Sequence, residues 1–187
     1  MVELKMKVSG YSGQRVLLHW LSAAVILWTL VTGFYVASVD VTARVANWVS
    51  FVNVSLTTLF IPFFVWRLAL FVVHTRSARV KALSSAELFA WGAHALIYAS
   101  VSVVLLSGVL MMDRPINVFG AFRIPQLLHD PALIEQFFTL HIWACVVLLW
   151  LVIGHIGAVI VHEWCGHRIL RRMAWRPRGT RAFNPCE

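Results

Sequence analysis

Charged residues are scarce in this chain of 187 residues. They make up 13% of it, about half of the roughly 25% that is typical of soluble domains, whereas hydrophobic residues make up 60%. This balance excludes an ordinary water-soluble domain and indicates one small integral membrane domain. The nine Trp and twelve Phe residues suit aromatic belts at the two membrane interfaces.

Cysteines are also too few for a disulfide framework. There are only three: Cys145 lies in an apolar stretch, and Cys165 and Cys186 follow it on the side that the basic residues mark as the reducing cytoplasm. Internal repeats and low-complexity tracts are absent from the sequence. The chain therefore has to be stabilised by packing within a membrane and not by covalent cross-links.

Four apolar segments are long enough to cross a bilayer. They cover about residues 16–39, 45–73, 88–112 and 137–162, and each reaches the ~20 residues needed for ~30 Å of hydrocarbon. The first is too long for the core of a signal peptide and lacks a convincing cleavage site, so we expect a retained helix. Pro62 predicts a kink in the second, and residues 113–136 are expected to form an ordered but irregular loop with three prolines.

The basic residues predict the orientation of these helices. Twelve fall on one side: Lys5, Lys7, Arg15, Arg76, Arg79, Lys81, Arg168, Arg171, Arg172, Arg176, Arg178 and Arg181. Arg44, Arg114 and Arg123 fall on the other side. This asymmetry places both termini in the cytoplasm, and it explains the net charge of +8 without nucleic-acid binding, because basic residues at the membrane edge can meet anionic lipid head groups.

The predicted fold is therefore an all-α, integral membrane four-helix bundle with both termini cytoplasmic. It covers residues 1–175, and residues 176–187 form a basic tail that is expected to be disordered. The expected location is the bacterial cytoplasmic (inner) membrane, as a multi-pass protein.

Histidines within the apolar segments are the main functional signal. His141 and His155 lie fourteen residues apart, which advances an α-helix by about 21 Å and returns it to within roughly 40° of the same face. His19 lies in the first segment at about the depth of His155. Histidine is costly inside hydrocarbon and usually has a function there, so His19 and His155 are predicted to be axial ligands of one haem and His141 a ligand of a second. The alternative for each is a buried histidine that is hydrogen-bonded to a neighbouring helix.

Two arginines are candidates for holding the haem propionates. Arg67 lies about 10 Å inside a predicted span, where a guanidinium needs an anion or a water path and can bind a propionate with two hydrogen bonds. Arg15 lies one turn from His19 and could bind the other propionate. The alternative for both is contact of the side chain with lipid phosphate.

Three further histidines need an interpretation. His162 lies two turns beyond His155 on nearly the same face, which suits a partner for a quinone carbonyl or a proton carrier, or else a contact with head groups. His94 has no obvious ligand partner, so a structural role is favoured. His162 and His167 are about 140° apart on a helix, unlike the histidines of a zincin, although a metal site that includes Cys165 stays an alternative.

The order of several motifs resembles the bacterial-type cytochrome b561 family, which is related to the membrane cytochrome b subunits of nickel-iron hydrogenases and formate dehydrogenases. The resemblance covers about residues 11–175. The matching residues are His19-Trp20, Arg67, His94-Ala95-Leu96-Ile97-Tyr98, Ser107-Gly108-Val109-Leu110-Met111-Met112, Phe119-Gly120-Ala121-Phe122, His141, His155 and His162. It implies a four-helix bundle that carries haem b and exchanges electrons with the quinone pool, through ubiquinone or menaquinone.

One position departs from the family pattern. The family has a haem-ligating histidine fourteen residues before the arginine that Arg67 matches, and this chain has Asn53 there. Asparagine is not among the usual protein ligands of haem iron. The pair His19/His155 is thus complete, while His141 lacks a partner, so the outer haem is absent, or five-coordinate, or has a sixth ligand from elsewhere. We expect one haem per chain, with the outer pocket empty, lipid-filled or weakly occupied.

The sequence thus predicts a membrane b-type cytochrome that transfers electrons between a haem and the quinone pool, as an electron-transfer protein or a quinone-linked oxidoreductase. Two alternatives remain: a membrane-anchor cytochrome subunit of a dehydrogenase or hydrogenase, and a non-redox membrane anchor or assembly protein that has lost its haems. The expected partners are the lipid bilayer, a quinone, and either a second copy of the chain or a redox partner subunit.

Overall fold

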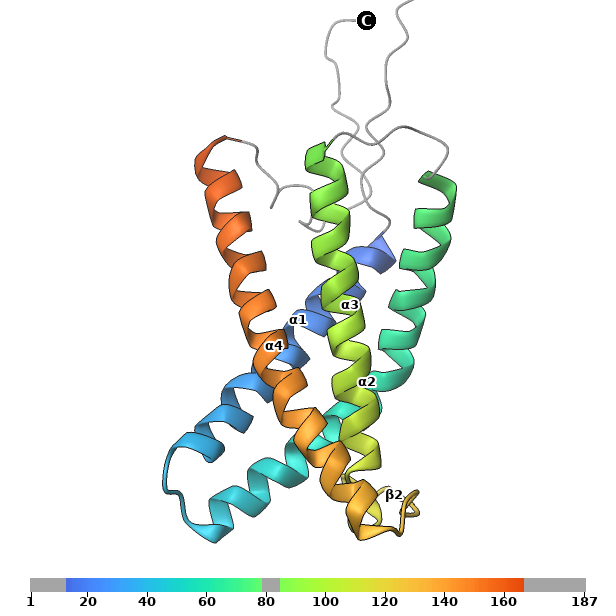
Figure 1. The fold of residues 1–187 in the computed structure, drawn as a ribbon, viewed down its shortest axis with the longest axis vertical. Helices are drawn as coiled ribbons and strands as arrows, with labels where there is room; N and C mark the ends of the chain where they lie inside the picture. Colours follow the sequence, from blue (N-terminus) through green and yellow to red (C-terminus); the bar gives the residue numbers. More distant parts are fainter. Residues whose placement is uncertain (1–12, 79–84, 167–187) are drawn as a thin grey trace, which may run out of the picture.

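The computed structural model describes residues 13–78 and 85–166, and its architecture is dominated by four long helices (Figure 1). These helices are α1 (Gly13–Ser38), α2 (Ala43–Ala78), α3 (Ser85–Leu110) and α4 (Pro131–Trp164). A short antiparallel hairpin of β1 (Ile116–Val118) and β2 (Phe122–Ile124) lies between α3 and α4. The all-α four-helix prediction is confirmed.

The helices associate mainly as two pairs, α1 with α2 and α3 with α4, and α2 also contacts α3. Because four successive helices alternate in direction, α1 begins and α4 ends at one end of the bundle, which we call the terminal end. The hairpin and the link between α1 and α2 lie at the opposite end (Figure 1), which we call the hairpin end. The histidines of the two ends therefore define two separate levels.

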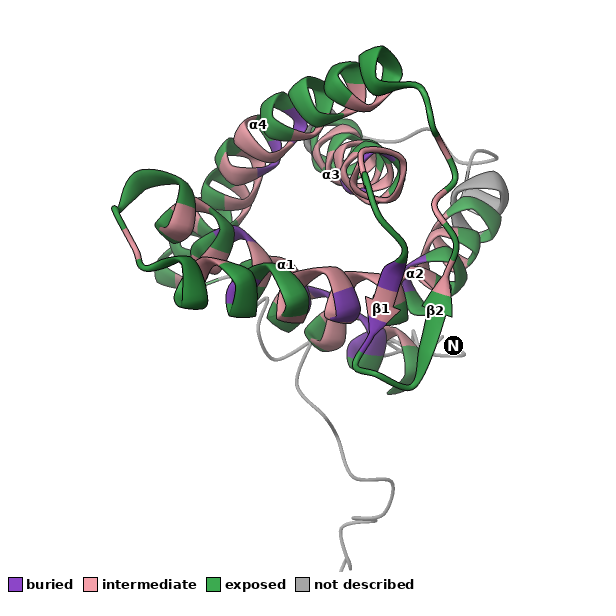
Figure 2. Ribbon diagram, turned by 90° about the horizontal axis from the view of Figure 1, so that it is seen from below, coloured by how far each residue is buried: buried purple, intermediate pink, exposed green. Residues whose placement is uncertain are grey.

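All four helices are long and apolar enough to cross a membrane. The spanning segments are Gly13–Ser38, Ala43–Val73, Glu87–Leu110 and Pro131–Trp164, close to the predicted ones. The surface agrees with this assignment, since many large apolar side chains are exposed, among them Trp143, Trp150 and Trp164. Buried and half-buried residues lie mainly on the inward sides of the helices (Figure 2), as expected where lipid covers the outside.

The predicted kink in the second span is present. Pro62 lies inside α2, and the helix changes direction clearly near its middle (Figure 1). Proline removes one helical hydrogen bond and its ring crowds the preceding turn, which is sufficient to bend a helix. The bend separates the half of α2 that carries Asn53 from the half that carries Arg67.

The region between α3 and α4 is more regular than the sequence predicted. The expected loop over residues 113–136 instead contains the β1–β2 hairpin, and α4 begins at Pro131, six residues before the predicted span. Asp130 caps this helix by accepting a hydrogen bond from the Ala132 N–H at 2.9 Å, and proline suits the first helical turn. The prolines were interpreted as signs of irregularity, whereas Pro131 starts a helix.

The hairpin is fastened to α2 by one buried serine. Ser55 Oγ donates to the Asn117 carbonyl at 3.1 Å and accepts from the Phe119 N–H at 3.2 Å. Phe119 and Gly120 both have positive φ angles, 47° and 76°, as in the tight turns that close two-stranded hairpins. The hairpin thus lies against α2 at this end of the bundle.

Candidate haem sites

Four side chains from four different helices gather at the terminal end. They are His19 of α1, Arg67 of α2, His94 of α3 and His155 of α4, and they form what we call the terminal-end cluster. Arg67 Nη2 lies 3.0 Å from His19 Nδ1, and the rings of His94 and His155 meet edge to face with centroids 5.3 Å apart. His19 is also close enough to His94 and His155 to interact electrostatically with both. Residues that the sequence assigned to one depth thus come together across the bundle.

The contact between Arg67 and His19 defines a proton position. A guanidinium has only donors, so Nδ1 of His19 is the acceptor in this contact and the ring proton resides on Nε2. Arg67 also lies over the ring of Tyr98, 5.3 Å from its centroid, a favourable cation–π geometry. Binding of iron through Nε2 of His19 would require the other tautomer, in which Nδ1 carries the proton and can no longer accept from Arg67.

His94 has a defined place beside the predicted ligand pair. Its Nδ1 lies 2.7 Å from the Ala90 carbonyl, which only accepts, so Nδ1 carries the proton and Nε2 keeps a lone pair. The structural role favoured for His94 agrees with this backbone hydrogen bond. Its ring contact also orients His155, which makes His94 a neighbour of the predicted ligand pair.

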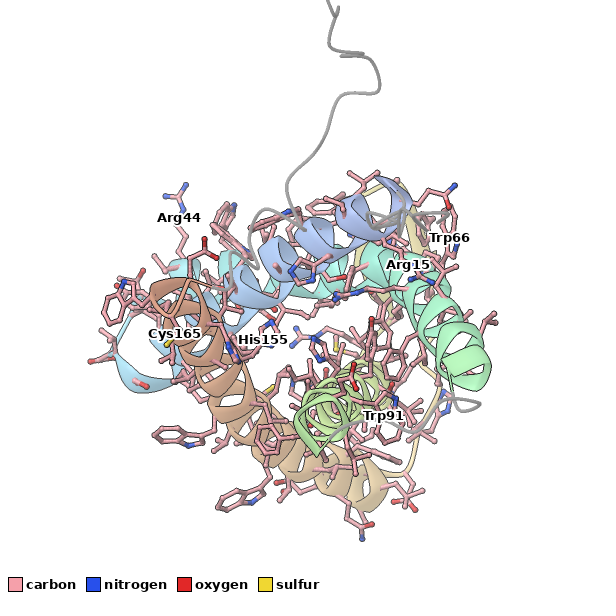
Figure 3. The ribbon with its side chains drawn as sticks, turned by 90° about the horizontal axis from the view of Figure 1, so that it is seen from above. Arg15, Arg44, Trp66, Trp91, His155 and Cys165 are labelled. Atoms are coloured by element: carbon pink, nitrogen blue, oxygen red, sulfur yellow. The ribbon has the colours of Figure 1, made fainter. Side chains whose placement is uncertain are left out.

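Arg15 and His162 lie nearer the membrane surface at the same end. Arg15 is half-buried and His162 is exposed. Seen from the terminal end, His155 and Arg15 lie toward the space that the helices enclose, whereas Arg44 and Trp66 lie at the periphery (Figure 3). Arg15 of α1 therefore lies toward the enclosed space, whereas His162 lies on the last turns of α4.

An apolar layer separates this cluster from the other end. It contains Val25, Leu30, Phe60, Phe64, Val101 and Leu148. Leu148 lies midway along α4 between His141 and His155 and is 2% exposed. The two histidine levels are thus distinct sites, and not one continuous polar channel.

The hairpin end contains a cavity of about 330 Å³, which is within the range of ~300–1,000 Å³ for ligand pockets. Its lining comes from all four helices and from β1, and it includes both Asn53 and His141. We call it the hairpin-end cavity. Asn53, which stands where the family has a second ligand, and His141 therefore line the same cavity.

His141 is held in the tautomer that a metal ligand needs. Its Nδ1 lies 3.1 Å from the Val104 carbonyl and 3.2 Å from Ser107 Oγ. A carbonyl can only accept, so Nδ1 carries the proton and Nε2 keeps its lone pair. Metal-bound histidines usually donate their second ring N–H to such a group, and the Cys145 thiol lies 3.5 Å from Nε2.

Gly108 makes this approach of His141 feasible. A Cβ atom at that position would lie 3.1 Å from Cε1 of the imidazole, closer than side-chain contacts normally allow. The Ser107-Gly108 pair of α3 thus provides both the hydrogen-bond partner and the space for the ring.

Asn53 lies across this cavity in a different bonding arrangement. Its Oδ1 lies 3.1 Å from Thr32 Oγ1, which also lies 2.8 Å from the Trp28 carbonyl. The hydroxyl of Thr32 has one proton and can donate it to only one of these two oxygens. The side chain of Asn53 thus contacts α1 through Thr32 at the edge of the cavity.

The donor set therefore fits haem differently at the two ends. At the terminal end, His19 and His155 supply two imidazoles, and haem needs only such axial ligands. At the hairpin end, one imidazole is prepared for iron and the facing residue is an amide. No group of three or more His, Cys, Asp and Glu side chains that could hold a metal ion occurs in the described residues, and His167, a candidate partner of Cys165, lies outside them.

No role was assigned from the sequence to several residues that contact the predicted site residues. Tyr98 lies four residues after His94 on the same face of α3, and Cys145 lies four after His141, so helical spacing was the available signal. Thr32 carried no signal of its own and Ser107 was noted only as part of a family motif, because the contacts of both residues with other helices cannot be deduced from spacing.

The family comparison agrees with this arrangement. The sequence model described as prokaryotic cytochrome b561 matches residues 10–176, which include both histidine levels. A search of curated proteins found no match. The match covers nearly the whole chain and therefore shows its family.

Proposed function

Because the chain belongs to the prokaryotic cytochrome b561 family, a family of membrane b-type cytochromes that take part in electron transfer, we propose that it transfers electrons between one haem b and the quinone pool. The observation that carries the proposal is the terminal-end cluster, in which the predicted ligand on α1 contacts Arg67 and the predicted ligand on α4 contacts His94. When bound, the haem supplies the one-electron chemistry.

Each predicted haem-binding residue would have a separate task. His19 and His155 would bind the iron. Arg67, which contacts His19 in the structure, could bind one propionate, and Arg15 could bind the other. The apolar layer next to the cluster excludes water, which together with the buried cation adjusts the reduction potential.

A quinone would exchange at the same end, near His162 and Arg15. The head group of a quinone has carbonyl oxygens that accept hydrogen bonds, and the imidazole of His162 can donate to one of them and carry a proton. The exposed position of His162 at the end of α4 makes it accessible from the interface, where quinone head groups lie. Because His162 is two turns from His155, electron transfer between quinone and haem and proton transfer at His162 would occur close together.

Replacing His162 with alanine should slow the reduction of the haem by quinol and leave the optical spectrum of the haem intact. The reason is that His162 would contact the quinone and not the iron. Stopped-flow reduction with a ubiquinol or menaquinol analogue measures the rate. His129→Ala, which alters an exposed histidine of the link between β2 and α4, is the matched control; equal rates in both variants would place the quinone elsewhere.

The terminal end is proposed to face the cytoplasm of a bacterial inner membrane. Twelve basic residues fall on this side and three on the other, which is the asymmetry of cytoplasmic loops. A reporter that is active only in the cytoplasm should therefore be active when fused after Glu187. Activity of a reporter that works only in the periplasm, fused at the same place, would show the opposite orientation.

A reduced-minus-oxidised spectrum and a haem-to-protein ratio test the function as a whole. We expect the sharp α-band of low-spin haem b and a ratio near one in purified protein. A protein without haem would instead be a membrane anchor or assembly factor. Co-purification of a dehydrogenase or hydrogenase subunit in stoichiometric amount would identify an anchor subunit, whereas a free-standing cytochrome would purify alone or as a homodimer.

A further inference from the structure

The contact between His141 and Cys145 has no part in electron transfer through the terminal-end haem. Both residues lie on α4, four positions apart and therefore on one face of the helix, and both line the hairpin-end cavity. Cys145 Sγ lies 3.5 Å from His141 Nε2, and Cys145 is a free cysteine. An imidazole nitrogen and a thiol sulfur thus lie side by side at one cavity.

We propose that His141 and Cys145, together with Met111 of the turn that follows α3, bind one copper(I) ion at the hairpin-end cavity. The ion takes the place of the thiol proton: the Cu–S bond forms as the S–H bond breaks, the proton is released to water, and no electron is transferred. The proposal does not depend on the proposed function, because it requires neither haem nor quinone.

The geometry of the pair fits a chelated ion. Tetrahedral metal sites in proteins have bond lengths of about 2.0 Å to an imidazole nitrogen and about 2.3 Å to a thiolate sulfur. With these bond lengths, the 3.5 Å between Nε2 and Sγ corresponds to an N–metal–S angle of about 109°. The two ligand atoms therefore already have the separation that a shared ion requires.

The hydrogen bonds of His141 leave the correct nitrogen for this ion. Its Nδ1 donates to the Val104 carbonyl at 3.1 Å, so Nε2 carries the lone pair, and Nε2 is the nitrogen beside the thiol. Metal-bound histidines usually have their second ring N–H fixed in this way. The S–H group of Cys145 can donate to the same lone pair, and this is the proton that the ion replaces.

Met111 is the third candidate ligand. Its N–H donates to the Ser107 carbonyl at 2.8 Å, so it continues the last turn of α3, three residues beyond Gly108 and near the same face. Long side chains of a helix point back toward its N-terminus, which for Met111 is the direction of Gly108 and of the His141 ring beside it. Met111 lines the cavity together with the pair, and its thioether is a soft ligand of the kind that copper(I) prefers.

The charge of the cavity favours copper(I) over zinc. None of the described residues that line it is Asp, Glu, Lys or Arg. One thiolate balances a monovalent ion, and the imidazole and the thioether are neutral, so exchange of the thiol proton for copper(I) leaves the net charge unchanged. With the same ligands, Zn²⁺ would leave one uncompensated positive charge inside a membrane-spanning segment, which is costly.

Anaerobic titration of the full-length protein with copper(I), in competition with a colorimetric copper(I) chelator, tests the proposal. The reference protein is Cys165→Ser/Cys186→Ser, because other thiols can also bind copper. It should bind one copper(I) ion per chain and bind Zn²⁺ more weakly, and X-ray absorption should show two sulfur ligands and one nitrogen ligand. Loss of copper binding in this reference protein, or tighter binding of Zn²⁺ than of copper(I), would overturn the proposal.

Variants of the three ligands, made in the reference protein, measure each contribution. Cys145→Ser and His141→Ala should each lower the affinity for copper(I) by more than the roughly 10- to 100-fold that follows loss of a hydrogen-bond partner of a ligand. Met111→Leu should retain the ion but reduce the sulfur ligands from two to one. Met112→Leu is the matched control and should retain both, because Met112 is not among the residues that line the cavity.

Unchanged copper affinity in Cys145→Ser or in His141→Ala would contradict the site, and two sulfur ligands in Met111→Leu would exclude Met111. The low-spin haem of the terminal end is measured separately by its α-band, which should be the same in Cys145→Ser and Met111→Leu as in the reference protein, since neither residue belongs to the terminal-end cluster. Absence of that band from the wild-type protein would contradict the electron-transfer proposal alone, because copper binding is measured by the chelator and by X-ray absorption.

Discussion

Replacing either His19 or His155 with alanine should remove the low-spin haem from the protein. Each would be one of two axial ligands, contributed by α1 and α4. Loss of a ligand should reduce the affinity for haem by more than the roughly 10- to 100-fold that follows loss of a hydrogen-bond partner of a ligand. The measurements are the haem-to-protein ratio and the α-band of the reduced protein.

His94 and His129 provide two different controls for this experiment. His129→Ala changes an exposed histidine and should leave both measurements at the wild-type level. His94→Ala removes a ring that contacts His155 but no predicted ligand, so it should keep the low-spin band and shift the reduction potential. Full haem content and a wild-type band in both His19→Ala and His155→Ala would show that the ligands have been assigned wrongly.

Arg67 links the ligand pair to the charge of the haem. In the structure its guanidinium donates to His19 Nδ1 at 3.0 Å and lies over Tyr98. Within a membrane-spanning helix, a cation needs such partners. These contacts with His19 and Tyr98 satisfy the guanidinium at the depth of the histidine, and the same side chain could bind a propionate if haem is bound there.

The fold could be predicted from the sequence because the membrane imposes it. Every backbone polar group must be satisfied within lipid, so long apolar segments can only be helices, and the four spans were placed to within a few residues apart from the start of α4. The error there had a local cause, since Pro131 in the first turn after a capping Asp130 starts a helix instead of breaking it. The hairpin over residues 116–124 was missed because three-residue strands have too little periodicity to be recognised.

For the candidate site, the sequence predicted the depth of each residue along its helix but not its contacts with other helices. The fourteen-residue interval on α4 correctly separated two levels, because helix rise and rotation are fixed. Contacts between helices were not predictable in the same way. The pairing of Thr32 with Asn53 depends on how α1 crosses α2, and the contact of Ser107 with His141 depends on how closely Gly108 lets α3 approach α4.

Asn53→His should raise the haem content from about one toward two per chain, with the second haem low-spin. The reason is that Asn53 and His141 line the same cavity from α2 and α4, and the substitution would supply the missing axial ligand. The cavity has kept its space, and the tautomer of His141 is already the one that iron requires. Haem content by pyridine haemochrome and the spin state by electron paramagnetic resonance are the measurements.

The substitution should also change how far electrons can move. The two histidine levels on α4 are fourteen residues apart, or about 21 Å along the helix, with the apolar layer around Leu148 between them. With one tightly held haem, the wild-type protein should act as a relay on the side of the terminal end, whereas Asn53→His should reduce an impermeant acceptor on the opposite side of a proteoliposome more rapidly. His141→Ala combined with Asn53→His is the control, since it removes the new pair and should return both haem content and transmembrane rate to the lower level. Two low-spin haems in the wild-type protein would contradict the prediction and require an outer ligand other than Asn53.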